Sequence, residues 1–273
     1  MAAGGGHVSP TTTHVRRADL QLDFADQVVL VTGASSGIGA AVAKSFAALG
    51  ARMVLHYNRG HDAVQGVQRS IEAAGGRTST VAADLGTPGA AAALVDHVLD
   101  EYGRIDVLVN NAGDLLRRAP VSEMSDEDFD QIIALNLASV VATCRQAVPV
   151  MRRQGAGAIV NVTSIAARTG GGGGSVLYAT AKGGLSTFTR GLARELAPDG
   201  IRVNAVSPGI IATPFHDRHT AADQMQAMVD GIPMGRPGDP EECVGAVLFL
   251  ACTALSSYVT GQVLEVNGGQ LTP

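Results

Sequence analysis

The chain has 273 residues and a formal net charge of −5, with 46% hydrophobic and 16% charged residues. This composition supplies a buried core and excludes a wholly disordered chain. The acidic balance, without a long basic run, argues against a nucleic-acid partner. No run of about 18 apolar residues occurs, so we predict no membrane-spanning helix. The three cysteines lie far apart without a CxxC pair, which excludes a disulfide framework and a cysteine-based zinc site.

The first 26 residues differ in composition from the rest of the chain. Residues 1–14 are rich in Gly, Ser, Thr, Pro and Ala and show no hydrophobic periodicity. A twin-arginine export signal needs an apolar stretch after its arginine pair, whereas Arg16 and Arg17 precede a stretch with two acids. We therefore predict a flexible extension over residues 1–26, a single catalytic domain over residues 27–273, and a cytoplasmic protein.

From Val28 onward, short β-branched runs alternate with longer Ala-rich stretches. The runs cover residues 28–31, 52–56, 78–81, 107–109, 158–162, 202–206 and 262–266. The helix-like stretches include residues 40–49, 90–102, 126–153 and 179–196. Most runs are apolar on both faces, and parallel neighbours need a crossover helix. The pattern predicts a doubly wound α/β domain, with a seven-stranded parallel sheet and helices on both faces.

A glycine-rich loop follows the first predicted strand. In the stretch from Thr32 to Ala40, Gly33 permits a tight turn and Gly37 lets backbone N–H groups approach a pyrophosphate. Gly39 allows the next helix to pack closely on the strand. By itself, such a loop is also consistent with an ordinary strand-to-helix turn that binds no ligand. Its position directly after the first strand favours a dinucleotide site.

The end of the second predicted strand indicates which dinucleotide binds. An NAD site places an acid there to hold the ribose 2′-OH, but residues 56–60 contain none. Arg59 is suited to pair with a 2′-phosphate, assisted by Asn58 and by the hydroxyls of Ser35 and Ser36. The alternative is that Arg59 is a solvated surface charge. We predict NADP as the cofactor, with NAD as the alternative.

Tyr178 and Lys182 are the candidate catalytic pair. They are four residues apart in a strongly helical stretch, so both side chains lie on one helix face. The chain contains only two lysines, Lys44 and Lys182. A phenol is a weak acid–base catalyst near neutrality, and an adjacent ammonium is expected to lower its pKa. Ser164 follows the fifth predicted strand and is expected beside them, where its hydroxyl can hold a substrate oxygen.

Residues 27–270 resemble the short-chain dehydrogenase/reductase family, whose motifs occur here in the family's order. The motifs are Thr32-Gly33-x-x-x-Gly37-x-Gly39, Asp84-Leu85, Asn110-Asn111-Ala112-Gly113, Asn136, Ser164, Tyr178-x-x-x-Lys182 and Pro208-Gly209. The resemblance implies a Rossmann-like fold. It also implies hydride transfer between a nicotinamide cofactor and a ketone or secondary alcohol, without a metal.

The resemblance also implies a role for each site residue. Tyr178 would exchange a proton with the substrate oxygen, Ser164 would orient the substrate, and Asn136 would hold a proton-relaying water. Lys182 would bind the nicotinamide ribose and lower the pKa of the tyrosine. The implied cofactor-binding residues are Gly33, Ser35, Ser36, Gly37, Ile38, Gly39, Asn58, Arg59, Asp84, Leu85, Asn111, Ala112, Gly113, Tyr178, Lys182, Pro208, Gly209, Ile211 and Thr213.

Two functional classes remain open. The first is an oxidoreductase, and the second is a non-catalytic dinucleotide-binding regulator with the same fold. Such regulators usually lack a catalytic side chain, whereas all four predicted ones are present here. Within the oxidoreductases, the chain resembles the 3-oxoacyl thioester reductases and the sugar or polyol dehydrogenases about equally. The expected partner is a small-molecule carbonyl or alcohol.

Three regions are expected to shape specificity and assembly. A lobe over residues 213–236 contains His216 and Arg218, which either hold a polar or anionic substrate or belong to solvated surface. Five consecutive glycines, residues 170–174, predict a mobile wall, and they place Ser164 one residue farther from Tyr178 than is usual in the family. The resemblance implies a homotetramer, formed by the helices over residues 126–153 and 179–196 and by the last strand.

Overall fold

The computed structural model describes residues 22–272. Its strands are β1 (Val28–Val31), β2 (Arg52–Tyr57), β3 (Arg77–Ala82), β4 (Val107–Asn110), β5 (Gly157–Val162), β6 (Ile201–Pro208) and β7 (Val263–Val266). Its helices are α1 (Gly37–Ala48), α2 (His61–Ala73), α3 (Ala90–Tyr102), α4 (Asp126–Ile133), α5 (Ser139–Gln154), α6 (Ala166–Thr169), α7 (Val176–Leu196), α8 (Pro214–His219), α9 (Ala222–Asp230), α10 (Pro240–Ala251) and α11 (Thr253–Ser256).

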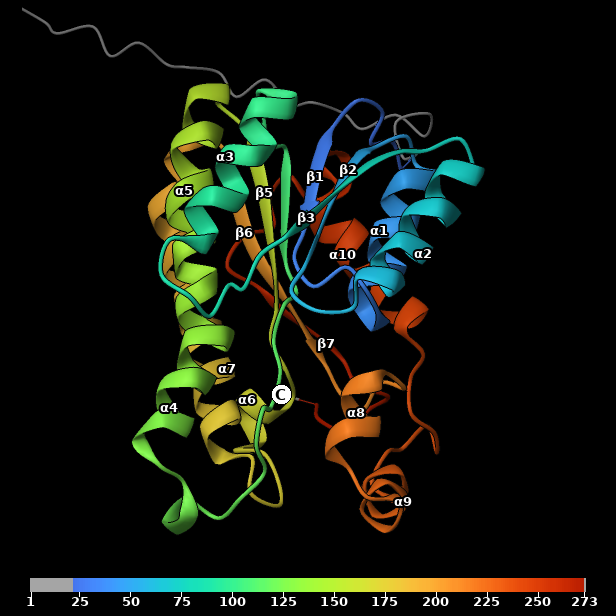
Figure 1. The fold of residues 1–273 in the computed structure, drawn as a ribbon, viewed down its shortest axis with the longest axis vertical. Coiled ribbons are helices and arrows are strands. Elements are labelled where there is room, and N and C mark those ends of the chain that lie inside the picture. The colour runs from blue at the N-terminus through green and yellow to red at the C-terminus, as the bar shows by residue number, and fades with distance from the viewer. Residues whose placement is uncertain (1–21, 273) are drawn as a thin grey trace, which may run out of the picture.

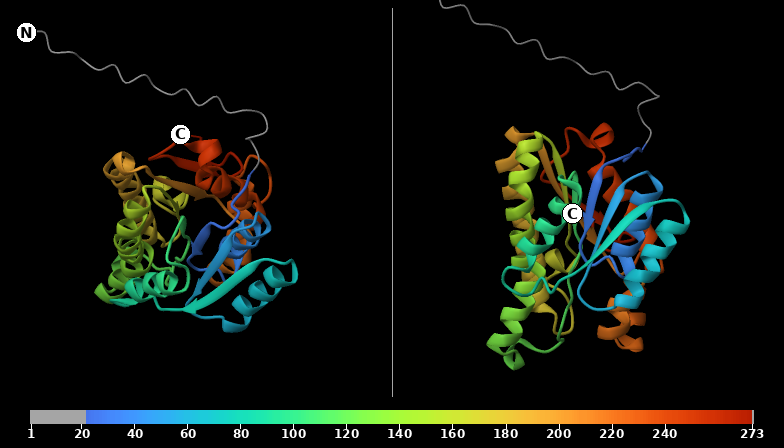
Figure 2. Two further views of the ribbon diagram at one scale, coloured as in Figure 1. Left: turned by 90° about the horizontal axis from the view of Figure 1, so that it is seen from above. Right: turned by 45° about the horizontal axis from the view of Figure 1, so that its top comes forward.

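All seven strands run parallel in one sheet with the order β3-β2-β1-β4-β5-β6-β7. The chain starts at β1 and builds outward to β3, and it then returns to β4 on the other side of β1. Helices α1, α2 and α10 cover one face of the sheet, and α3, α5 and α7 cover the other (Figures 1 and 2). The predicted doubly wound single domain is confirmed.

The strands differ in how deeply they are buried. Strands β1, β4 and β6 are buried along their whole length, as expected for strands covered by helices on both faces. The edge strands β3 and β7 are only partly buried. Burial on both faces, which we expected for most strands, is therefore confined to the inner strands, because an edge strand has a neighbour on only one side.

Residues 22–26 belong to the folded domain, although we assigned them to the extension. The ring of Phe24 is buried against Phe46 of α1, edge to face, with 4.7 Å between ring centroids. The Phe24 amide donates to the Leu49 carbonyl at 3.0 Å, and the Asp26 carboxylate pairs with Arg52 at 2.7 Å. The folded domain therefore begins at least five residues before residue 27, where we predicted its start. The rest of the predicted extension, residues 1–21, lies outside the described residues.

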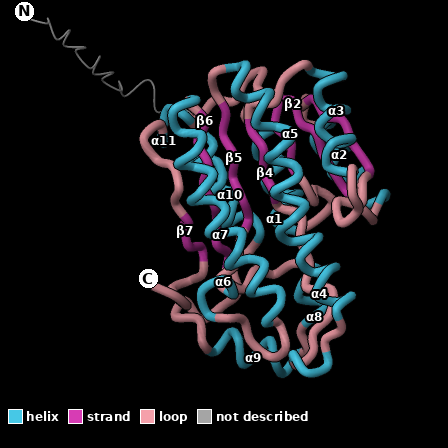
Figure 3. The backbone as a smooth tube through the Cα atoms, turned by 90° about the vertical axis from the view of Figure 1, so that its left-hand side faces the viewer, coloured by secondary structure: helices cyan, strands magenta, loops and turns pink. Residues whose placement is uncertain are grey.

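The predicted helix over residues 126–153 is interrupted in the structure. A capping box at Ser125 starts α4, and a π-helical turn, Ala134–Ala138, separates α4 from α5. The whole run, Asp126–Gln154, is long and apolar enough to cross a membrane by length and composition alone, and 44% of its most apolar window is buried inside the protein. A helix that packs its apolar side against a sheet also meets these criteria of length and composition, and α5 packs in this way. Figure 3 shows this run, with α7 beside it, along one side of the sheet.

A buried network of polar side chains joins the sheet to α5 and α7. Asn110, the last residue of β4, donates to Oδ1 of Asn161 on β5 at 2.9 Å and accepts from Thr143 of α5 at 2.8 Å. Asn161 donates in turn to Thr189 of α7 at 2.9 Å. Satisfied buried networks of this kind fix the elements that they join. The helix that carries the candidate catalytic pair is thus held in register with the strand ends.

Candidate active site

A cleft of about 1420 Å³ opens at the carboxyl ends of the central strands. Its lining residues come from the ends of β1, β2, β4, β5 and β6 and from the lobe that contains α8 and α9. Figure 1 shows where these helices lie relative to the strands. Single small-molecule sites usually occupy about 300–1,000 Å³, so this cleft has room for more than one such ligand. All predicted site residues line it except Gly39 and Asn136.

The glycine loop is shaped to admit a phosphate. Gly33 and Gly37 have φ angles of 67° and 53°, in the left-handed region that favours glycine. A Cβ on Gly39 would collide with the carbonyl oxygen of Gly33 and lie 2.5 Å from Nδ2 of Asn111. Ser36, the N-cap of α1, makes no side-chain cap bond, and the first turn of α1 contains no acid. The N-terminus of α1 is thus suited to an anion.

Asn111 fastens this loop to the end of β4. Its Nδ2 donates to the carbonyl oxygens of Thr32 and Gly33, at 2.9 and 3.0 Å. The hydroxyl of Thr32 accepts from the backbone N–H groups of Asn111 and Ala112, each at 3.0 Å. Two loops that are about 80 positions apart in the chain therefore form one rigid floor for the cleft.

His56 is a site residue that the sequence reasoning missed. It lies in β2, is 2% exposed and lines the cleft. Its Nδ1 lies 3.1 Å from the Gly33 amide nitrogen, which donates to it, and its Nε2 lies 3.0 Å from the Ala83 carbonyl oxygen. Both contacts are satisfied only by a neutral ring with the proton on Nε2. Burial lowers the pKa of His56 and so favours this neutral form.

The far end of the cleft contains the residues predicted to select the cofactor. Ser35, Ser36, Asn58 and Arg59 line it, and Arg59 is exposed. A Cβ on Gly60, the residue that precedes α2, would lie 4.0 Å from the Ser35 hydroxyl. The structure thus brings the glycine loop, Arg59 and the start of α2 together at one end of the cleft.

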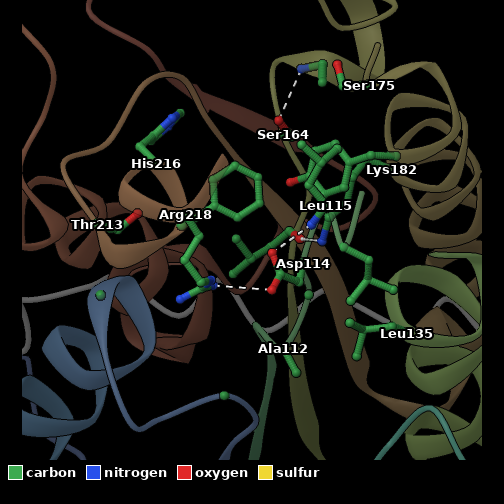
Figure 4. Close-up of a pocket in the computed structure, with 18 of the residues that line it drawn as sticks. Ala112, Asp114, Leu115, Leu135, Ser164, Ser175, Lys182, Thr213, His216 and Arg218 are labelled. Atoms are coloured by element: carbon green, nitrogen blue, oxygen red, sulfur yellow. Dashed lines mark hydrogen bonds and ion pairs between the residues drawn. The ribbon is translucent and has the colours of Figure 1, made fainter. Parts of the chain in front are cut away.

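Lys182 and Tyr178 line the cleft from the first two turns of α7. Figure 4 shows the side chain of Lys182 among the lining residues. The Lys182 side chain is 3% exposed, and its Nζ donates to the carbonyl oxygen of Val162 at 2.9 Å. This nitrogen lies 5.7 Å from the centroid of the Tyr178 ring. Burial lowers the pKa of Lys182 to about 8, because a charged ammonium is costly in an apolar site.

The pKa of Tyr178 moves in the direction opposite to the one we expected. Burial raises the pKa of Tyr178 to about 12, a hydrogen bond with Ser164 lowers it in part, and the Asp114 carboxylate raises it further. Lys182 does not lower it, since the lysine is itself desolvated and directed at the Val162 carbonyl. The expectation that the ammonium lowers the tyrosine pKa is therefore wrong for the protein alone.

Asn136 lies beneath the cleft in the π-helical turn and is fully buried. Its Nδ2 donates to the carbonyl oxygens of Ile132 and Asp114, at 3.0 and 2.8 Å, and its Oδ1 accepts from the Asp114 amide at 3.2 Å. A Cβ on Gly113 would lie 2.7 Å from this Oδ1 and 3.0 Å from Nζ of Lys182. Gly113 thus allows the lysine and the asparagine to approach each other.

The five-glycine wall has a defined shape in the structure. Four of its residues, Gly170, Gly171, Gly173 and Gly174, have positive φ angles. The guanidinium of Arg118 donates to the carbonyl oxygens of residues 172 and 173, at 2.6 and 2.8 Å, and the Gly174 carbonyl accepts from the Ala119 amide at 3.1 Å. These bonds connect the wall, for which we predicted mobility, to the segment after β4.

Helix α8 of the lobe forms one wall of the cleft. The Phe215 ring packs 5.8 Å from the Tyr178 ring, centroid to centroid. Nδ1 of His216 lies 3.1 Å from the Thr220 hydroxyl, and Arg218 reaches across the cleft to Asp114 at 3.3 Å (Figure 4). Both predicted polar residues of the lobe therefore already have partners within the protein. Among residues 22–272, no group of three or more His, Cys, Asp or Glu side chains is placed to hold a metal ion.

Comparisons with known proteins identify the family. A family model described as enoyl-(acyl carrier protein) reductase matches residues 33–270. A 3-oxoacyl-[acyl-carrier-protein] reductase of Synechocystis sp. is 40% identical over 245 residues, which are 90% of this chain and 97% of the relative. The chain belongs to the short-chain dehydrogenase/reductase family. It is an oxidoreductase that interconverts ketones and secondary alcohols.

Two solved structures show the same fold with different cofactors in their descriptions. A structure described as an NAD(P)-dependent gluconate 5-dehydrogenase from Beutenbergia cavernae, with bound NADP, is 36% identical, and its TM-score is 0.85 with 91% of this chain and 98% of that chain covered. An NADH-dependent reductase, A1-R′, described as responsible for alginate metabolism, is 33% identical with a TM-score of 0.85, covering 93% and 100% of the two chains.

We predict that His56→Gln destabilises the protein more at pH 7.5 than at pH 5.5. The substitution alters two buried hydrogen bonds, which together contribute about 1–3 kcal/mol. Because the folded-state pKa is lowered, the stabilisation by neutral His56 is complete above the ordinary value of 6.5 and is lost as the pH falls through the folded-state value. Urea unfolding of the wild type and the variant at both pH values measures the difference.

The matched control is His97→Gln, since His97 is an exposed histidine on α3 that contacts only Glu101 as an ion pair. The difference in free energy of unfolding between the wild type and His56→Gln should be smaller at pH 5.5 than at pH 7.5. The difference between the wild type and His97→Gln should be small at both pH values. An equal gap at both pH values would contradict the neutral bridging role of His56.

Proposed function

We propose that the protein is an NADP(H)-dependent reductase of ketones, with 3-oxoacyl thioesters as the substrate class. The observation that carries this proposal is the meeting of Tyr178, Lys182 and Ser164 with the glycine loop in one cleft. The 40% identity to a 3-oxoacyl-[acyl-carrier-protein] reductase favours the thioester class.

The state of Tyr178 suits the reductive direction. With a pKa of about 12, the phenol stays protonated near neutral pH, and this is the form that donates a proton to a carbonyl oxygen. Ser164 lies beside the phenol and is suited to orient the same oxygen by a hydrogen bond. Lys182 is placed behind the tyrosine to receive a ribose hydroxyl and to return the proton through its own amine. A bound nicotinamide dinucleotide supplies the hydride.

The fit to a dinucleotide rests on the glycine loop. The close packing at Gly39, the positive φ angles and the uncapped N-terminus of α1 leave room and N–H donors for a pyrophosphate. NADP is favoured over NAD because the end of β2 offers Asn58 and Arg59 without an acid. The guanidinium of Arg59 is exposed at that end and available to a 2′-phosphate.

A second candidate is a sugar or sugar-acid dehydrogenase. The cleft has polar groups where Arg218 of the lobe meets Asp114 of the segment after β4, and these groups favour a substrate with several hydroxyl or acid groups. The gluconate 5-dehydrogenase neighbour is consistent with this class. Turnover of acetoacetyl thioesters against keto-sugars, followed by NADPH absorbance, separates the two candidates. Tight NADPH binding without turnover of any carbonyl or alcohol would instead support the dinucleotide-binding regulator.

We also infer a cytoplasmic homotetramer without a nucleic-acid or membrane partner. Helices α5 and α7 expose part of their length on one flank, and Val176 at the start of α7 is 41% exposed. At the edge of the sheet formed by β7, Leu264 is 39% exposed. Two such surfaces suit two different two-fold contacts, which together generate a tetramer with D₂ symmetry.

Substitution Tyr178→Phe is expected to abolish turnover while NADPH binding is nearly unchanged. The variant keeps the ring that packs against Phe215 and loses only the phenolic hydroxyl. General acid–base contributions set a minimum loss in kcat of about 10²–10⁴-fold. Steady-state kinetics and NADPH titration by fluorescence measure both quantities. A variant with a third of the wild-type rate would disprove the acid–base role of this residue.

Substitution Arg59→Ala is expected to weaken NADPH binding by about tenfold or more and to leave NADH binding unchanged. The reason is the loss of a charge-assisted hydrogen bond to the 2′-phosphate, which NADH lacks. Calorimetric titration with each dinucleotide tests this. Arg69→Ala on the exposed side of α2 removes the same charge outside the cleft and serves as control. A wild-type protein that already prefers NADH would refute the choice of NADP.

Multi-angle light scattering is expected to give a mass near four times 27.8 kDa for the purified protein at micromolar concentration. Burial of the α5 and α7 flank would also stiffen the helix that carries Tyr178 and Lys182, so dilution to monomers should reduce activity. A fully active monomer at that concentration would rule out both the tetramer and its link to activity.

A further inference from the structure

The last residue of α8, His219, joins the lobe to the segment that follows β4. Its Nε2 lies 2.6 Å from Oδ1 of Asp114, and its side chain is only 12% exposed. The other carboxylate oxygen of Asp114 faces Arg218 at 3.3 Å, and the Leu115 amide donates to Oδ1 at 2.8 Å. The lobe is therefore connected to this segment, 105 residues earlier in the chain, by a short charge-assisted bond.

Arg118 makes a second connection to the same residue. Its Nε donates to the backbone carbonyl of His219 at 2.9 Å, while its Nη1 binds the carbonyls of the glycine wall, residues 172 and 173. One guanidinium thus joins the segment after β4, the glycine wall and the lobe. The planar donors of arginine are suited to hold several acceptors in a fixed arrangement.

The backbone between Asp114 and Arg118 is strained in a way that serves these contacts. Leu116 has a φ angle of 60°, in the left-handed region that bulky residues rarely adopt. The Arg117 amide donates to the Leu115 carbonyl at 2.7 Å, which folds the segment into a tight turn. Strain of this kind persists where surrounding contacts maintain it, and it is concentrated at functional sites.

The connection reaches the reacting hydroxyl through aromatic packing. The Phe215 ring lies 5.3 Å from the His219 ring and 5.8 Å from the Tyr178 ring, centroid to centroid. Phe215 also lines the cleft, as Ser164 does. The position of His219 therefore sets where the Phe215 wall stands relative to the tyrosine.

We propose that His219, held by Asp114 and Arg118, is a positioning residue that fixes the width of the substrate pocket beside Tyr178. This proposal rests on the proposed function, because it concerns the pocket of the same reaction. With the anchor made, Phe215 stays close to Tyr178 and admits ketones with a slender group on the carbonyl carbon. Without the anchor, the protein exists as a mixture of molecules with an open lobe and molecules with a closed lobe. The apparent affinity for substrate then falls in proportion to the fraction of molecules whose lobe is closed.

The first test is hydrogen exchange in the lobe, which does not depend on turnover. In His219→Ala, amides of residues 213–236 should exchange at least about tenfold faster than in the wild type, because the lobe loses its hydrogen bond to the Asp114 carboxylate. In His219→Gln, whose side-chain N–H can still donate to Asp114, exchange should remain within about threefold of the wild type. Unchanged exchange in His219→Ala would overturn the anchor.

The second test is selectivity between two 3-oxo esters that differ only in the group on the ketone carbon. With NADPH, His219→Ala should raise KM for ethyl acetoacetate about tenfold with little change in kcat, by the loss of the closed population. It should improve the relative efficiency with ethyl benzoylacetate, which carries a phenyl group there. An unaltered preference between the two esters would refute the specificity role.

Control variants distinguish the positioning role of His219 from the reductase activity proposed above. His97→Gln on α3 and Arg117→Gln, whose side chain pairs with Asp128 outside the cleft, should alter neither lobe exchange nor ester preference. NADPH affinity and the urea midpoint of each variant report whether a loss is confined to the lobe. If the wild type reduces no ketone, the proposed function fails, while the exchange experiment still decides whether His219 anchors the lobe.

Discussion

The cleft exists because the chain departs to opposite faces of the sheet after β1 and β4, which lie side by side. The loop after β1 enters α1 on one face, and the segment after β4 leads to α4 and α5 on the other (Figure 1). Because the two connections leave toward opposite faces, neither of them covers the carboxyl ends of β1 and β4. A ligand site at this topological switch point is therefore a consequence of strand order.

Three of the residues that line the cleft, together with Thr32, form side-chain hydrogen bonds with the backbone of its loops. Asn111 and Thr32 bind the backbone of each other's loops, His56 binds the Gly33 amide and the Ala83 carbonyl, and Arg118 binds carbonyls of the glycine wall and the lobe. Loops have few backbone partners of their own, so side chains must satisfy them. In this protein these bonds connect the glycine-rich loops of the cleft to neighbouring segments.

Burial has opposite chemical effects on the two members of the catalytic pair. It lowers the pKa of Lys182 to about 8 and raises the pKa of Tyr178 to about 12, because each group is shifted toward its neutral form. The protein alone thus holds a neutral phenol beside a lysine that titrates near physiological pH. In the proposed reductase, the protonated phenol is the form that donates a proton to a carbonyl oxygen.

Through the family resemblance, the sequence indicated many of the residues that line the cleft, but not His56. Periodicity and spacing by themselves predicted the fold class, the glycine loop and the pairing of Tyr178 with Lys182. These features depend on short-range rules: strand and helix periodicity, glycine conformations and the i,i+4 spacing of a helix. Asn110 was identified only as part of a family motif, and its buried hydrogen bonds with Asn161 and Thr143 were not predicted.

The tertiary structure alone revealed the roles of His56, Arg118 and His219, and the burial of Phe24. The partners of His56 and His219 lie 27 and 105 residues away, so no local pattern marks these contacts. The same holds for the pKa of Tyr178, where spacing to Lys182 predicted a lowered value and burial produced a raised one. Desolvation depends on everything packed around a group, and that packing is decided only when the distant segments of the chain come together.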